Sequence, residues 1–74
     1  MDKTAEVVAY ESLSEREKEI AEAMHRGLSR IDIAAALGIS GSTLHKHLEK
    51  IFLKLGVGSA TQMVLAVERA KVTR

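Results

Sequence analysis

The sequence has no cysteine and no proline, and Tyr10 and Phe52 are its only aromatic residues. Without cysteine, neither a disulfide nor a thiolate zinc site can stabilise the 74-residue chain. The scarcity of aromatic residues disfavours a β-sandwich or a β-barrel. No apolar run reaches about 18 residues, which argues against a membrane-spanning helix, and residues 1–12 lack the apolar centre of a signal peptide. We therefore expect a cytoplasmic protein that does not enter a membrane.

Apolar residues nevertheless make up 46% of the chain, which is typical of a packed domain and too high for a disordered one. The length allows one small domain, and with strands disfavoured an all-α bundle is the expected fold class. Residues 1–28 carry seven acidic and four basic residues, whereas residues 29–74 carry three acidic and seven basic ones. This division indicates either a positive face directed at an anion or charges scattered over a solvated surface.

Serine and glycine residues divide the chain into four expected helices. Ser14 and Glu17 have the spacing of a capping box, and a serine also precedes each later helix. A glycine follows each of the first three helices, where a left-handed residue ends a helix. The expected helices are 15–26, 30–37, 41–55 and 60–70. The domain is predicted to span residues 13–74, after an N-terminal extension or linker at residues 1–12 that includes at most a short extra turn around Val7, Val8 and Tyr10.

The third helix has the most regular apolar stripe. Four of its residues recur every three or four positions and lie within about 60° of arc: Leu44, Leu48, Ile51 and Leu55. The connection before it, residues 38–40 (GIS), is typical of the helix-turn-helix unit, which projects its second helix into the DNA major groove. The same connection also occurs as a corner used only for packing, so the spacing alone leaves both interpretations open.

With that stripe facing inward, Lys46 points outward and begins a row of lysines at every fourth position. Ser42 and Lys46 are placed to reach base edges, and Thr43, His47 and Lys50 to reach phosphates. A solvated row of lysines on an ordinary helix is the alternative. The residues predicted to contact DNA are Arg30, Ser42, Thr43, His45, Lys46, His47, Glu49, Lys50 and Lys54.

Glu49 is the one acidic residue in this set. It either accepts a hydrogen bond from a cytosine amino group or pairs with His45, and the pairing is the favoured interpretation. His45 and His47 lie about 200° apart on a helix and cannot bind one metal ion. Since no nucleophile–base constellation or phosphate-binding glycine loop is present either, the sequence predicts no enzyme, no metal site and no cofactor.

The last helix has more apolar surface than one buried face requires, because residues 63–67 are apolar without a break. Its inner face is predicted to consist of Ala60, Val64, Val67 and Lys71. Its outer face is predicted to form a two-fold homodimer interface, made of Thr61, Leu65, Glu68 and Val72. The alternative is that the apolar residues on this face are single exposed side chains of the usual kind.

A series of short segments is shared with a known family: residues 13–20 (LSEREKEI), 27–29 (GLS), 32–34 (DIA), 37–40 (LGIS), 42–44 (STL), His47, 54–57 (KLGV) and Ser59. Residues 13–67 thus resemble, without a gap, the DNA-binding domain of LuxR/GerE-type bacterial transcription regulators. The resemblance implies a tetrahelical helix-turn-helix domain. Its third helix would enter the major groove, and its fourth would form a dimer on an inverted-repeat site.

Four positions depart from the family's usual pattern, in which a basic residue is frequent there: Ile31, His45, Glu49 and Ala60. Fewer cations imply a lower affinity for DNA and a weaker dependence of that affinity on salt. The departures leave the expected fold unchanged and affect the expected target sequence and affinity.

The resemblance also implies partners other than DNA. Such domains usually follow a receiver or ligand-sensing domain, so the chain is either a standalone effector or the C-terminal domain of a larger regulator. RNA polymerase is a further candidate partner. One alternative function is a protein–protein adaptor with weak or no DNA binding, suggested by Ile31, Leu53 and Glu49. Another is a sigma-factor-type promoter-reading domain, which the apolar last helix disfavours.

Overall fold

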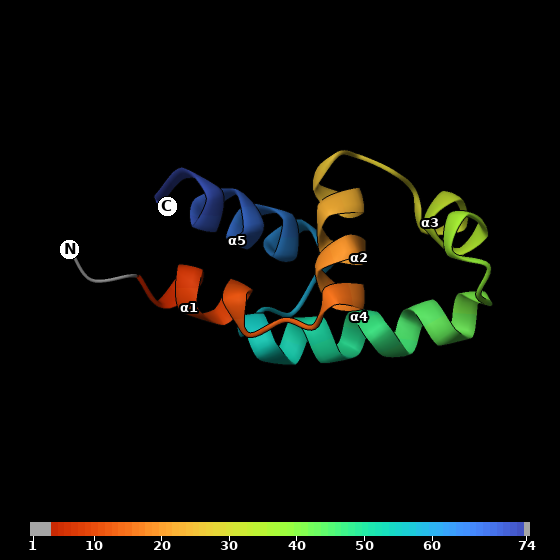
Figure 1. Ribbon diagram of the computed structural model, residues 1–74, viewed down its shortest axis with the longest axis horizontal. Coiled ribbons are helices and arrows are strands. Elements are labelled where there is room, and N and C mark those ends of the chain that lie inside the picture. The colour runs from red at the N-terminus through yellow and green to blue at the C-terminus, as the bar shows by residue number, and fades with distance from the viewer. Residues whose placement is uncertain (1–3, 74) are drawn as a thin grey trace.

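The chain folds into α-helices joined by short turns (Figure 1). The computed structural model describes residues 4–73, in which no strand occurs. No single helix in this part of the chain is long and apolar enough to cross a membrane, although residues 41–55 and 60–72, bent by 54°, pass that test as a pair. The all-α class and the four expected helices are confirmed, and one helix is added. The helices are α1 (Ala5–Glu11), α2 (Glu15–His25), α3 (Arg30–Leu37), α4 (Gly41–Leu55) and α5 (Ala60–Thr73).

The longest helix, α4, lies along the long dimension of the molecule, whose principal extents are 40 × 21 × 20 Å (Figure 1). α2 crosses the middle of α4, and α3 packs at its N-terminal end. α1 and α5 lie side by side at the opposite end. The helix pair α3–α4 therefore forms one end of the molecule.

Serine and threonine hydroxyls begin the helices. Each accepts a hydrogen bond from the backbone amide three residues later, which satisfies a donor that the first helical turn leaves free. The predicted capping box is also present, since Oε1 of Glu17 accepts the backbone amide of Ser14 at 2.8 Å. The capping residues are Thr4, Ser14, Ser29, Ser40 and Ser59.

Three helices end in the same kind of turn. Gly27, Gly38 and Gly56 have positive φ angles, which cost little without a Cβ atom. After each glycine, the amide of an apolar residue donates to the carbonyl five residues earlier, at 3.0–3.1 Å. The side chains of these apolar residues pack against the core, so the chain is anchored as soon as each helix ends. They are Leu28, Ile39 and Val57.

The N-terminal segment corrects the expected four-helix architecture. Residues 1–12 were predicted to be an extension or linker with at most an extra turn, whereas residues 5–11 form the two-turn helix α1. α1 packs against α5 and α4 and buries Val7 and Tyr10. Two turns are too short to show an apolar period in sequence, so its formation depends on this tertiary packing. Residues 1–3 lie outside the described part of the chain.

The prediction of which face of α5 is buried was also wrong. Of the predicted inner residues, Val67 is fully buried, but Lys71 is exposed. The buried face is rotated by about 80° from the predicted one, and α5 packs against both α1 and α2. The buried residues of α5 are Met63, Ala66, Val67 and Ala70. The stripe of α4 is confirmed, with Leu44, Leu48 and Ile51 at most 1% exposed and Leu55 half-buried.

A buried carboxylate connects α2 to α4. Glu17 is 5% exposed, and its Oε1 accepts hydrogen bonds from the Ser14 amide and from Nζ of Lys54 at 2.7 Å. Burial raises the pKa of Glu17, but the hydrogen bonds from Lys54 and Ser14 and the lysine charge outweigh it, so the pKa lies below the ordinary value. The carboxylate is therefore ionised in the folded protein at neutral pH.

We predict that Gly38→Ala destabilises the fold by about 1 kcal/mol, because alanine is strained at a φ of 68° while no atom obstructs its Cβ. Gly41→Ala is the matched control. Gly41 has no positive φ and also has open space around it, so alanine there should be neutral or stabilising by about 0.5 kcal/mol. Urea denaturation measures both changes, and equal effects would contradict the assignment of strain to Gly38.

We predict that the free energy of unfolding falls as the pH drops below about 4.5, the ordinary pKa of a glutamate. The unfolded chain then takes up a proton before the folded chain does, since the pKa of Glu17 is lowered on folding. This stabilisation is complete above that pH and is lost as the pH falls through the folded pKa. Urea denaturation from pH about 7 to about 3 checks this.

Glu17→Gln should flatten this pH dependence and cost about 1 kcal/mol at neutral pH. The matched control is Glu15→Gln, which alters an exposed carboxylate on the same helix. Glu22 has a pKa lowered in the same direction, so a residual dependence is expected. A full pH dependence in the Glu17→Gln protein would show that the stabilisation has another source.

Candidate nucleic-acid interface

The connection between α3 and α4 fixes the angle of the two helices. Gly38 ends α3 with a left-handed residue, the Ile39 amide donates to the Ala34 carbonyl at 3.0 Å, and the Ile39 side chain packs on the core. Ser40 then caps α4 directly. The three-residue turn predicted from sequence is therefore tightly held, and the first turns of α4 are presented at the end of the molecule (Figure 1).

Three hydroxyl groups gather at the N-terminus of α4. Ser40 Oγ lies 3.0 Å from Thr43 Oγ1 and 3.1 Å from Ser42 Oγ, and it also accepts the Thr43 amide. Ser42 and Thr43 are exposed. Their hydroxyls, together with the free amides of a helix N-terminus, form a polar surface that suits hydrogen bonding to phosphate oxygens or to base edges.

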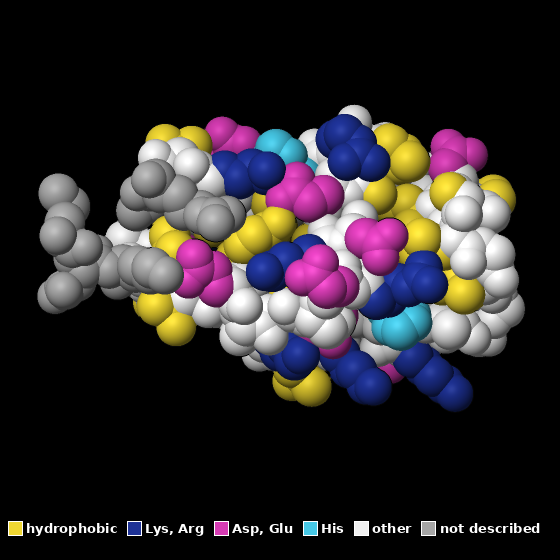
Figure 2. Space-filling model, in the orientation of Figure 1, with side chains coloured by type: hydrophobic (Ala, Val, Ile, Leu, Met, Phe, Trp, Pro, Cys, Tyr) yellow, Lys and Arg dark blue, Asp and Glu magenta, His cyan; other side chains and the backbone are white. Residues whose placement is uncertain are grey.

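Two lysines lie on the outward face of α4. Lys46 and Lys50 are one helical turn apart and exposed. Neither ammonium group has an ion-pair partner within residues 4–73. In the space-filling view, lysine and arginine side chains gather along the lower edge, over α4 (Figure 2). This edge is therefore the part of the predicted site with free positive charge.

Lys54 differs from the other two lysines of the row. Its Nζ donates to the buried Glu17 carboxylate, so its charge is paired within the domain although the lysine side chain is 40% exposed. The sequence spacing gave no sign of this, because Glu17 lies 37 positions away. The basic row on α4 is thus shorter than the sequence indicates, and Lys54 holds the helix in place.

The pairing favoured for the acidic residue of the site is present. Nε2 of His45 lies 3.7 Å from Oε2 of Glu49, and both side chains are more than half exposed. His47 is half-buried on another side of α4. Among the described residues, no group of three or more histidine, aspartate or glutamate side chains is placed to hold a metal ion.

An apolar hollow that the sequence analysis did not foresee lies beside the hydroxyl cluster. It has a volume of about 310 Å³ and separates the first turn of α3 from that of α4. Ile31, Ala34 and Leu44 line it, and Arg30 and His45 stand at its edge. Ile31 is 81% exposed, so its apolar side chain is open to solvent at the edge of this hollow. Its position beside the basic surface makes it part of the candidate site.

The residues predicted to form a dimer interface lie on the outer face of α5. Leu65 is 50% and Val72 73% exposed, and Thr61 is exposed. A hollow of about 290 Å³ is lined by Ala60, Thr61, Val64 and Leu65. Glu68 is held at the border of this face, since its Oε1 lies 2.6 Å from Nε2 of His25 at the end of α2.

Comparison with known proteins identifies the fold unit. The profile of the family described as "Bacterial regulatory proteins, luxR family" matches residues 11–67. The chain is 41% identical over 54 residues to the probable transcriptional regulatory protein SgaR of Hyphomicrobium methylovorum, covering 73% of this chain and 26% of SgaR. It is 37% identical over 51 residues to the transcriptional regulatory protein UhpA of Escherichia coli strain K12, covering 69% of this chain and 26% of UhpA.

The same values are found for UhpA of Salmonella typhimurium. The chain spans about a quarter of the length of these relatives. No solved structure matches it significantly. The family match includes the whole of α2, α3 and α4, and with them the turn, the two free lysines and the apolar hollow. It leaves out all of α1 except Glu11 and ends within α5.

Proposed function

Because this chain belongs to the LuxR family of bacterial regulatory proteins, we propose that it binds double-stranded DNA sequence-specifically and regulates transcription in the bacterial cytoplasm, with α4 in the major groove. The family is one of regulatory proteins, and the chain is not an enzyme. A regulatory domain with free positive charge on an exposed helix has DNA as its natural ligand.

The observation that carries the proposal is the pair of free ammonium groups on Lys46 and Lys50, in the helix that follows the helix-turn-helix connection. Other basic side chains, such as Lys54 and Lys71, are engaged in ion pairs inside the molecule. Free cations on the outward face of a helix can neutralise DNA phosphates. The counterions that the DNA then releases make binding more favourable.

Different parts of the site take different roles in this proposal. Ser42 and Lys46, in the first two turns of α4, read base edges. Thr43, Lys50 and His47 contact phosphates, as does Arg30 at the start of α3. The pairing of Glu49 with His45 keeps its negative charge from repelling the backbone when the imidazole is protonated.

The affinity of a single domain is expected to be modest. Lys54 is bound to Glu17, and Ile31 contributes an apolar surface beside Arg30 instead of a cation. A homodimer on an inverted-repeat site compensates by doubling the contacts. The exposed Leu65 and Val72 and the hollow around Thr61 support α5 as the dimer interface, with Glu68 at its border.

We predict that selection of the purified domain on random duplex DNA at low salt enriches an inverted repeat with half-sites about one helical turn apart. On that site, Lys46→Ala should reduce affinity about tenfold through a lost base contact. Lys50→Ala should reduce the slope of log affinity against log salt by roughly one unit. Fluorescence anisotropy across a salt series measures both quantities.

Arg16→Ala is the matched control for these variants, because Arg16 is exposed on α2, which carries none of the proposed DNA contacts. It should bind like the parent protein. If both lysine variants also bind like the parent, the assignment of α4 as the recognition helix is wrong. If no sequence is enriched at low salt, the proposed function fails as a whole.

We predict that Leu65→Glu turns a dimer into a folded monomer, because it places a charge where two copies of α5 would meet. Size-exclusion chromatography with light scattering measures the mass, and circular dichroism checks that the helices persist. Val8→Glu alters a comparably exposed apolar residue on α1 and should leave the mass unchanged. A parent protein that stays monomeric both alone at high micromolar concentration and on DNA would rule the interface out.

A further inference from the structure

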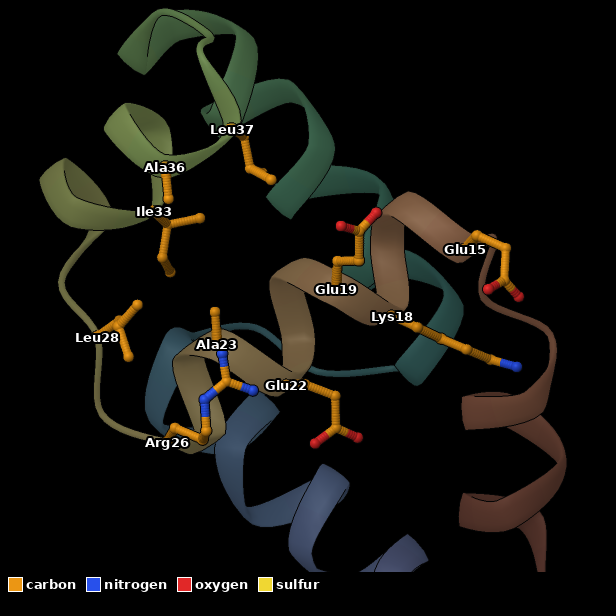
Figure 3. Close-up of a pocket in the computed structure, with 10 residues that line it drawn as sticks. All are labelled: Glu15, Lys18, Glu19, Glu22, Ala23, Arg26, Leu28, Ile33, Ala36 and Leu37. Carbon is orange, nitrogen blue, oxygen red and sulfur yellow. The ribbon is translucent and has the colours of Figure 1, made fainter.

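A third hollow lies between α2 and α3, apart from the proposed DNA surface. Its volume is about 410 Å³, the largest among the hollows described above. In the close-up, Leu28, Ile33 and Leu37 point from the α3 side toward α2, where Ala23 faces them (Figure 3). In the space-filling view, hydrophobic side chains are visible here between acidic and basic groups (Figure 2). The floor of the hollow is thus apolar. Ile33 and Ala23 are buried beneath it, and the surface that solvent reaches comes from Leu28, Ala36 and Leu37.

The rim of the hollow carries free charges of opposite sign at its two ends. Glu15 and Glu19 are one helical turn apart on α2, and neither carboxylate has a partner among the described residues. Arg26, near the other end of α2, also has no partner in residues 4–73. The distance along the helix from Glu15 to Arg26 is about 16 Å.

The other two charged residues of the rim are already engaged. Glu22 accepts a hydrogen bond from the Tyr10 hydroxyl and pairs with Lys71 at 2.9 Å. The ammonium group of Lys18 lies over the ring of Tyr10, 5.9 Å from its centroid. Glu22 therefore holds α1 and α5 against α2, and Lys18 contacts α1. The ammonium group keeps its positive charge over the ring, and the two carboxylates of Glu15 and Glu19 exceed it, so the Glu15 end is negative overall.

We propose that this hollow is a docking site for an amphipathic helical segment of a partner protein. The segment would place its apolar face on Leu28, Ala36 and Leu37. Its basic residues would lie over Glu15 and Glu19, and an acidic residue over Arg26. About three turns of helix match the length of the rim. The apolar floor supplies the affinity, and the two charged ends set the direction in which the segment lies.

The position of the hollow allows docking while the protein is bound to DNA. On α3, three residues line each hollow: Ile33, Ala36 and Leu37 line this one, and Arg30, Ile31 and Ala34 line the one beside the proposed DNA surface. The mean directions of the two sets are about 110° apart around the helix. The free carboxylates also repel a phosphate backbone, so DNA itself is not the occupant. This inference goes beyond the proposed function and does not require it.

The test uses a synthetic helical peptide of about three turns with a leucine stripe, two lysines at one end and a glutamate at the other. A second peptide has the same leucines with the charges exchanged. Each is titrated into the isotope-labelled protein, and backbone amide shifts are followed by NMR. The first peptide should shift amides of residues 15–37 and bind more tightly than the second.

Glu15→Gln and Glu19→Gln should each weaken the first peptide about two- to fivefold, and Glu19→Lys should instead strengthen binding of the exchanged peptide. Glu6→Gln, on α1, is the matched control and should change neither affinity. Equal affinity for the two peptides, shifts centred on α5, or no shifts at millimolar peptide would overturn the proposal.

The glutamine variants also separate this inference from the proposed function. They should bind the selected DNA site as the parent does, because neither residue lies on α3 or α4. If the peptide binds but no DNA site can be selected, the docking proposal is supported and the DNA-binding proposal is contradicted. If the protein binds the selected DNA site but neither peptide, the DNA-binding proposal is supported and the docking proposal is contradicted.

Discussion

A single carboxylate oxygen, Oε1 of Glu17, joins the start of α2 to the last turn of α4. It completes the capping box with Ser14 and holds Lys54 at the same time. Because α2 crosses the middle of α4, this contact fixes the helix that carries the proposed DNA-reading residues relative to the body of the domain. The α3–α4 corner is then built outward from a rigid support.

The ion pairs of the described residues divide the charges into those used for folding and those left for partners. Glu17 with Lys54, Glu22 with Lys71 and Glu68 with His25 each connect two helices. The charges left over include Lys46 and Lys50 on the outward face of α4 and Glu15 and Glu19 on the rim of the α2–α3 hollow. A net charge of +1 conceals both surfaces.

Local signals predicted much of this architecture, since Ser14, Ser29 and Ser40 begin helices and Gly38 and Gly56 end them by backbone chemistry that acts within a few residues. The prediction failed where the outcome depends on distant packing. α1 is stabilised by contacts with α5 and α4, and the buried side of α5 depends on its packing against α1 and α2. The engagement of Lys54 with Glu17 was hidden for the same reason. The predicted DNA contacts themselves remain predictions.

α1 brings the two ends of the described chain to the same side of the molecule. Thr4 leads into α1, and α5 runs back beside it, while the α3–α4 corner occupies the opposite end (Figure 1). A fluorophore, an affinity tag or a second domain joined to either end would lie at the end of the molecule opposite the α3–α4 corner. An attachment at either end is thus kept away from the surface that meets the major groove in our proposal.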